Sequence, residues 1–154
     1  FLSTVPSHGG ASQNPVGEPQ TREFQKVEIN REWGLKDSFN YSTYRGILYT
    51  QEELKSLWGN TVNLYTEIGS RSTSGAPVMP DIDFNKYSVI WYADRGVNAS
   101  FITLNGVFEY ENVIQADVTH FYSDFGSSRF NLWAIPKTNK PIIFIEREAS
   151  DRGI

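Results

Sequence analysis

Few side chains in this chain of 154 residues are suited to acid–base or nucleophilic chemistry. There is no cysteine, which excludes thiolate catalysis, disulfides and cysteine-bound metal. His8 lies in a stretch rich in Gly, Ser and Pro, so His120 is the one candidate general base. Asp117 and Asp124 are acids near it in the sequence, and a small hydrolase that uses His120 with one of them is one hypothesis. No GxSxG elbow, Walker loop or HExxH motif accompanies it, so we expect neither metal nor cofactor.

Two further charged groups flank one apolar run, PDIDFNKYSVIWYADRG. Asp81 and Asp83 point the same way in an extended chain, but no glycine-bearing loop and bidentate Glu follow to complete a calcium site. Asp94–Gly96 has the composition of a turn, in which glycine supplies a positive φ. The pattern favours a structural role for both groups, as caps and turns around a strand anchored by Phe84.

The elements that position these groups are mostly strands. The segment Tyr44–Thr50 predicts a strand with Ile47 and Tyr49 on one face and Leu48 on the other. The run YSVIWYA within the stretch above has apolar groups on both faces, which is typical of a central strand covered on both sides. Further strands are predicted around Phe24 to Asn30 and in ASFITL, NGVFEYENVIQADVTHFY, SSRFNLWAIPK and KPIIFIERE, with TVNLYTEI as a strand or extended segment.

One short helix is predicted near residues 51–58. Thr50 and Glu53 form a capping box in which each side chain bonds the other residue's amide, and Gly59 is expected to end the helix. About seven strands with one helix predict a mainly β domain, an antiparallel β-sandwich or open barrel. The main hairpin turns either at Asn105-Gly106 or at Glu111-Asn112, and the second choice makes Gly106 part of a bulge.

Composition limits the range of functions. The 14 Lys and Arg against 18 Asp and Glu leave a net charge of −4, so nucleic acid is not an expected partner. No apolar run is long enough to span a membrane. Residues 1–20 predict a flexible N-terminal tether, suited to a lipid anchor through a removed segment or simply a disordered end, and residues 21–154 a single β-rich domain.

The helix TQEELKSLW, the DFNKYSVIWYADRG run, a strand pair from Ser100 to Thr119 and the closing FNLWAIPKTNKPIIFIE occur in an order that resembles the protease complex subunit PrcB family. The resemblance implies a non-enzymatic accessory domain of bacteria, secreted or lipid-anchored at the cell envelope on its periplasmic or extracellular side. It implies a protein partner, such as a component of a protease complex. It also favours the hairpin turn at Glu111-Asn112.

The chain departs from the family between Asp94 and Ser100, and again at DFGSSRFN. A partner contact particular to this protein is therefore predicted there, with help from aromatic side chains that exceed the needs of one core. The predicted contact residues are Asp94, Arg95, Asn98, Phe101, Tyr122 and Phe125. The alternative to a protein-binding module is a carbohydrate-binding β-sandwich that uses exposed aromatic rings.

Overall fold

A computed structural model describes residues 2–4, 14–29, 33–35, 43–62, 65–67, 78–94, 99–122 and 129–150. In these stretches the chain forms eleven strands, six of which have six or more residues, and one helix. The elements are β1 (Leu2–Thr4), β2 (Gln20–Arg22), β3 (Gln25–Lys26), β4 (Trp33–Leu35), β5 (Thr43–Leu48), α1 (Gln51–Val62), β6 (Tyr65–Glu67), β7 (Tyr87–Asp94), β8 (Ala99–Glu109), β9 (Ile114–Tyr122), β10 (Arg129–Pro136) and β11 (Ile142–Ser150).

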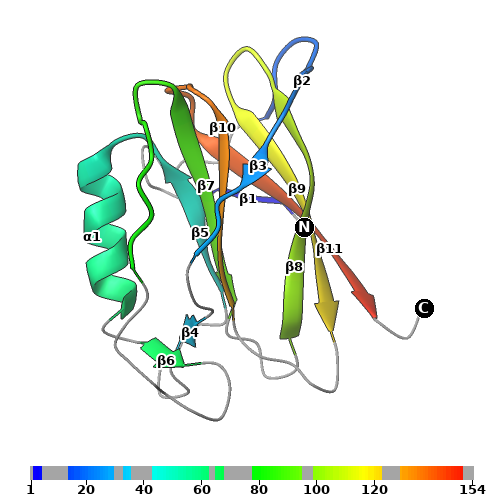
Figure 1. Cartoon of the computed structure of the whole chain (residues 1–154). Coiled ribbons are helices and arrows are strands. Elements are labelled where there is room, and N and C mark those ends of the chain that lie inside the picture. Colours follow the sequence, from blue (N-terminus) through cyan, green and yellow to red (C-terminus); the bar gives the residue numbers. More distant parts are fainter. Residues whose placement is uncertain are drawn as a thin grey trace.

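Two sheets form the body of the protein, and the predicted mainly β sandwich class is confirmed (Figure 1). Sheet A has the order β1-β11-β9-β8-β2 and sheet B the order β3-β10-β7-β5, while β4 and β6 form a separate pair. One pairing departs from the predicted antiparallel arrangement, because β11 runs parallel to β9. The chain leaves sheet A after β9, forms β10 in sheet B and returns, which is the crossover that parallel neighbours require.

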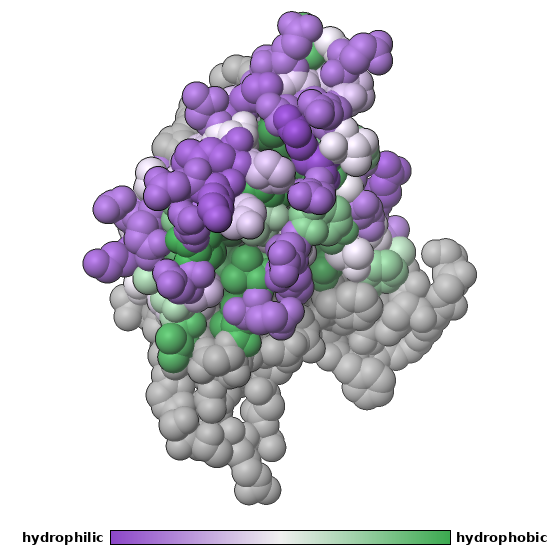
Figure 2. All heavy atoms as spheres, turned by 45° about the horizontal axis from the view of Figure 1, so that its top comes forward, coloured by the Kyte–Doolittle hydropathy of each residue, from purple (hydrophilic) through white to green (hydrophobic). Residues whose placement is uncertain are grey.

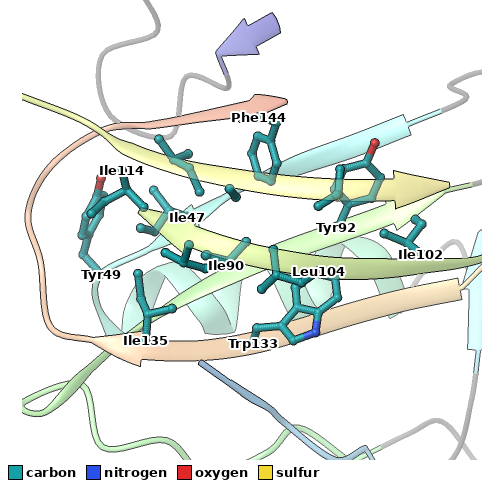
Figure 3. Packing of buried hydrophobic residues seen from close by; sticks show 14 residues of the cluster. Ile47, Tyr49, Ile90, Tyr92, Ile102, Leu104, Ile114, Trp133, Ile135 and Phe144 are labelled. Atoms are coloured by element: carbon teal, nitrogen blue, oxygen red, sulfur yellow. The ribbon is translucent and has the colours of Figure 1, made fainter. Parts of the chain in front are cut away.

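The main core lies between the two sheets (Figure 3). Phe144 from sheet A and Ile90 and Tyr92 from sheet B are fully buried there, and Tyr49 and Tyr92 lie at opposite ends of the cluster. Ile47 and Tyr49 face this core while Leu48 faces the other side of sheet B, so the predicted alternation of this strand is confirmed.

A second cluster of buried side chains lies on the outer face of sheet B, where α1 packs (Figure 1); we name it the helix-covered cluster. Leu54 and Trp58 of the helix belong to the same buried cluster as Val89, Trp91 and Leu132 of the sheet. The central strand β7 therefore buries apolar side chains on both of its faces, as the run YSVIWYA predicts.

The start of α1 differs in detail from the predicted capping box. The amide of Glu53 donates to the Thr50 hydroxyl over 3.2 Å, but the Glu53 carboxylate accepts from the amide of Tyr49, over 2.6 Å, instead of that of Thr50. The predicted end at Gly59 is wrong, because the helix continues to Val62. Gly59 has no positive φ, and a glycine within a helix lowers stability by only about 1 kcal/mol, which does not force an end.

The main hairpin turns at Glu111-Asn112, the later of the two predicted positions. The amide of Tyr110 donates to the carbonyl of Val113 across the turn, over 2.9 Å. The pairing of β8 with β9 shifts register between Leu104 and Gly106, so the residues around Gly106 form the predicted bulge.

The predicted strand around Phe24 to Asn30 is shorter than expected. The chain instead forms β2 at the edge of sheet A and β3 at the edge of sheet B, and Glu23 and Phe24 cross between the two sheets. The amide of Val27 continues the pairing along β10 by donating to the carbonyl of Leu132 over 2.9 Å. Asn30 lies outside the described residues.

Two stretches of the predicted tether are described. Leu2–Thr4 pairs with β11, and the amide of Val16 donates to the side-chain oxygen of Asn112 over 2.9 Å. The domain boundary near residue 20 stays a prediction. Within the described stretches, the helix α1 is neither long nor apolar enough to cross a membrane.

Lys140 fastens the loop between β10 and β11 to the end of the hairpin. Its ammonium lies 2.7 Å from one carboxylate oxygen of Glu109. The Nε of Arg22 lies 2.8 Å from the other oxygen of the same carboxylate. Burial of Glu109 alone would raise the pKa of its carboxyl, but the hydrogen bonds from Lys140 and Arg22 hold this pKa below the usual value.

The environment of Tyr49 leads us to expect a loss of stability at alkaline pH. Burial, and then the nearby charge of Glu53, raise the pKa of Tyr49 to about 12, and its hydroxyl donates to the carbonyl of Lys140. The native state therefore keeps a proton that the unfolded chain loses near pH 10. Because only the native state still holds this proton above about pH 10, the free energy of unfolding does not depend on Tyr49 ionisation below that pH. It falls by about 2 kcal/mol as the pH rises from about 10 to about 12. Urea unfolding across this range should show a shallower decline for Tyr49→Phe, and equal declines would contradict the prediction.

Candidate functional site

Three of the six predicted contact residues have a described backbone, and they lie at one end of the sandwich. Asp94 ends β7, Phe101 lies near the start of β8 and Tyr122 ends β9, at the end where β4 and β6 lie in Figure 1. Arg95, Asn98 and Phe125 lie outside the described residues, as do all six side chains. The predicted contact at this end stays a prediction.

His120 lies inside the sandwich in a cluster of four polar side chains, which we name the inter-sheet cluster. Its members are Arg45 and Tyr92 from sheet B and His120 and Glu146 from sheet A. The Tyr92 hydroxyl lies 2.5 Å from Nε2 of His120, and an oxygen of Glu146 lies 3.7 Å from the same nitrogen. The other oxygen of Glu146 lies 3.0 Å from Nε of Arg45.

The acid that faces His120 is therefore Glu146. Asp117 belongs to the same strand as His120, but three residues along a strand reverse the side-chain direction. Its carboxylate instead lies 3.1 Å from the side-chain nitrogen of Gln115 and 3.9 Å from exposed Arg147. The predicted pairing of His120 with Asp117 is thus wrong, while Asp124 lies outside the described residues.

The inter-sheet cluster has limited access to solvent. The His120 side chain is 8% exposed, and those of Arg45 and Glu146 are 16% and 14% exposed. Tyr92 is fully buried and packs edge-on against both His120 and Phe144. Among the side chains that the structure describes, no group of three or more His, Asp or Glu could hold a metal ion. The cluster fits a role in joining the sheets, because one hydrogen bond and one ion pair link side chains of sheet B to side chains of sheet A.

The more accessible site is an open groove on the outer face of sheet B, beside the part covered by α1. Its floor is formed by Tyr87 of β7 and Ala134 of β10. One wall is the segment 23–28, which includes β3, and the other is the segment 81–83. The groove consists of two adjoining hollows of about 280 and 190 Å³ that share Gln25, Tyr87 and Ala134.

The wall 81–83 is held in place by its own turn. The carbonyl of Asp83 accepts from the amides of Lys86 and Tyr87, each over 3.0 Å, and its carboxylate accepts from the amide of Asn85 over 3.0 Å. Ile82 and Phe84 pack against the helix-covered cluster of sheet B. These bonds support the predicted role of Asp83 as a turn cap and of Phe84 as an anchor.

Two aromatic rings of the groove reach solvent. Phe24 is 37% exposed and Tyr87 is 42% exposed, whereas Trp58, Trp91 and Trp133 are buried. The side chain of Trp33 lies outside the described residues. Most of the coloured residues in Figure 2 are hydrophilic, and hydrophobic side chains gather between purple ones in the middle of the view.

The groove is acidic. Among the described residues that line it, Glu23, Glu28, Asp81 and Asp83 are acidic and Lys26 alone is basic. The Lys26 ammonium donates to the side-chain oxygen of Asn131 over 2.7 Å and lies 5.7 Å from the centre of the Trp133 ring.

None of the residues that line the groove was predicted as a site residue. Phe24 carried a signal, since it falls out of step with Val27 and Ile29, which both pack into the helix-covered cluster. Ala134 carried none, because an alanine in a strand gives no indication of what faces it. The meeting of β3, β7 and β10 is set by pairing between distant segments, which a local pattern does not reveal.

The fold and the groove define a class of protein: a two-sheet β-sandwich with one helix on its outer face and an acidic, aromatic groove beside that helix. A scan against protein-family models finds no match, and searches of curated proteins and of solved structures find none either.

Proposed function

We propose that this chain is a non-enzymatic interaction domain that holds a protein partner in the groove between segments 23–28 and 81–83. The observation that carries the proposal is that two aromatic side chains of the groove, Phe24 and Tyr87, are exposed to solvent. The small side chain of Ala134 lies beside Tyr87 on the floor. Aromatic side chains are enriched in protein interfaces because they bury a large area with little loss of conformational entropy.

The open shape of the groove favours a polypeptide over a small molecule. Small-molecule sites usually enclose the ligand and bury most of its surface. The two hollows here, of about 280 and 190 Å³, are instead open to solvent and adjoin each other near one edge of sheet B. A chain that lies along the groove fills both hollows at once.

The cellular setting of the proposal rests on the resemblance to the PrcB family. It comprises location at the bacterial cell envelope, attachment through a lipid anchor and a partner from a protease complex. The inter-sheet cluster is assigned a structural role in this proposal, since His120 is mostly buried and its Nε2 is hydrogen-bonded to the Tyr92 hydroxyl.

Site-specific cross-linking in the native cells tests the proposal. With benzoyl-phenylalanine in place of Tyr87, we expect irradiation to yield an adduct with one defined protein, found in the envelope fraction. Filling the groove with Ala134→Phe should reduce the yield several-fold, because the new ring occupies the floor that both hollows share.

The matched control carries the same photoreactive residue at exposed Glu148, on β11 in the other sheet. Equal adducts from both positions, or a yield that Ala134→Phe leaves unchanged, would contradict the groove as the binding site. Thermal unfolding of Ala134→Phe checks that the fold is retained.

A further inference from the structure

We infer that the partner enters the groove as an extended segment that carries lysine or arginine side chains. This inference rests on the proposed function and adds the chemistry of the partner to it. It is argued from the shape of the groove, its charge and its exposed rings.

The shape fits an extended chain. One wall follows residues 23–28, and five steps of about 3.3 Å give it a length of about 17 Å. Five or six extended residues match this length. Side chains of an extended segment alternate in direction, so every second one would point to the floor at Tyr87 and Ala134.

The charge of the groove selects for cations. Four carboxylates line it, those of Glu23, Glu28, Asp81 and Asp83. None of them lies in an ion pair with another residue that the structure describes. The ammonium of Lys26 is directed toward Asn131 and Trp133 of β10, so it neutralises only part of this charge. Complementary charge across an interface speeds association and suppresses wrong partners, and here it disfavours anionic membranes and nucleic acid.

The exposed rings supply a second reason to favour cations. Ammonium and guanidinium groups are attracted to the face of an aromatic ring, and the stems of lysine and arginine also pack on apolar surface. Tyr87 lines both hollows and Phe24 lines one of them. A cationic side chain between these rings and the rim carboxylates would satisfy both interactions.

A titration followed by amide NMR tests the inference on the whole chain. The probe is a blocked six-residue peptide that alternates lysine with valine, and the comparison peptide has glutamine in place of each lysine. We expect the lysine peptide to move the amide signals of Gln25, Val27, Ile82 and Ala134 at low salt. Added salt should weaken this binding, because partly exposed charges are screened.

A pair of substitutions checks the role of the carboxylates. The double variant Glu28→Gln with Asp81→Asn should raise the Kd of the lysine peptide about three- to tenfold, the range expected for the loss of two partly exposed ion pairs. The control, Glu52→Gln with Glu148→Gln, removes the same amount of charge from exposed positions on α1 and β11 and should leave the Kd unchanged.

The outcomes separate this inference from the proposed function. If both peptides move the groove signals with equal Kd, the cationic chemistry is wrong while the groove remains a binding site. If the control pair weakens binding as much as the groove pair, the effect is one of net charge and the inference fails. If neither peptide moves the groove signals and the Tyr87 cross-link is also absent, both the inference and the proposed function fail.

Discussion

The substitution Phe144→Ala is expected to lower the free energy of unfolding by about 3–5 kcal/mol. Phe144 is fully buried at the centre of the core between the sheets, where its ring lies edge-on to Tyr92 with 5.7 Å between ring centres. The Arg45 guanidinium lies 6.0 Å from the same ring. Because the two sheets pack against each other through this layer, the cavity left by the ring cannot close without moving whole strands.

Phe108→Ala is the matched control for this prediction. Phe108 belongs to β8 in the same sheet, but it is only partly buried on the outer face. We expect a loss of about 1 kcal/mol there, because less apolar area leaves water on folding. Urea unfolding measures the free energy of unfolding of both variants, and the comparison holds if their m-values are equal. Equal losses of stability for the two variants would contradict the assigned core.

The sequence predicts the core strands well because each carries its information locally. In the segment that forms β7, apolar residues on both faces indicate burial on both sides, and the structure confirms it. Ile47 and Leu48 likewise show their two faces through the period of two. The turn at Glu111-Asn112 was favoured by the family resemblance, since Asn105-Gly106 carries the stronger local turn signal.

Features set by distant pairing escape the same analysis. Phe24 and Val27 are three residues apart, yet one crosses between the sheets and the other packs on the helix-covered face. The parallel pairing of β11 with β9 depends on where β10 inserts, and no periodicity along one strand records it. The groove arises from three such long-range placements together, so its residues emerge only from the fold.

The inter-sheet cluster shows the same limit for polar residues. The sequence places Asp117 and Asp124 near His120, but distance along a strand is a poor guide to which side chains meet. Glu146 lies 26 residues further along, and the register of β11 on β9 brings it beside His120, since Glu146 pairs with Val118. A charge inside an otherwise apolar core therefore has its partner in another strand.

The substitution Glu146→Ala is expected to cost about 2–4 kcal/mol, because it removes the carboxylate that faces both Arg45 and His120. Both members of the Arg45–Glu146 pair are mostly buried, at 16% and 14% exposure, so water compensates only partly for the lost partner. By contrast, Arg147→Ala removes a 63% exposed partner of Asp117 and should cost about 0.5 kcal/mol or less.

A double substitution tells whether this loss comes from the stranded charge or from lost packing. Replacing both members, as Arg45→Met with Glu146→Leu, removes the desolvated charges together and keeps the apolar stems, so we expect stability to return to within about 1 kcal/mol of the original chain. If the double variant instead loses the sum of the two single effects, the pair is not coupled. Recovery of stability would mean that the pair contributes little net stability. Its role would then be to fix the alignment of sheet A on sheet B. The guanidinium on β5 meets the carboxylate on β11 in one alignment only.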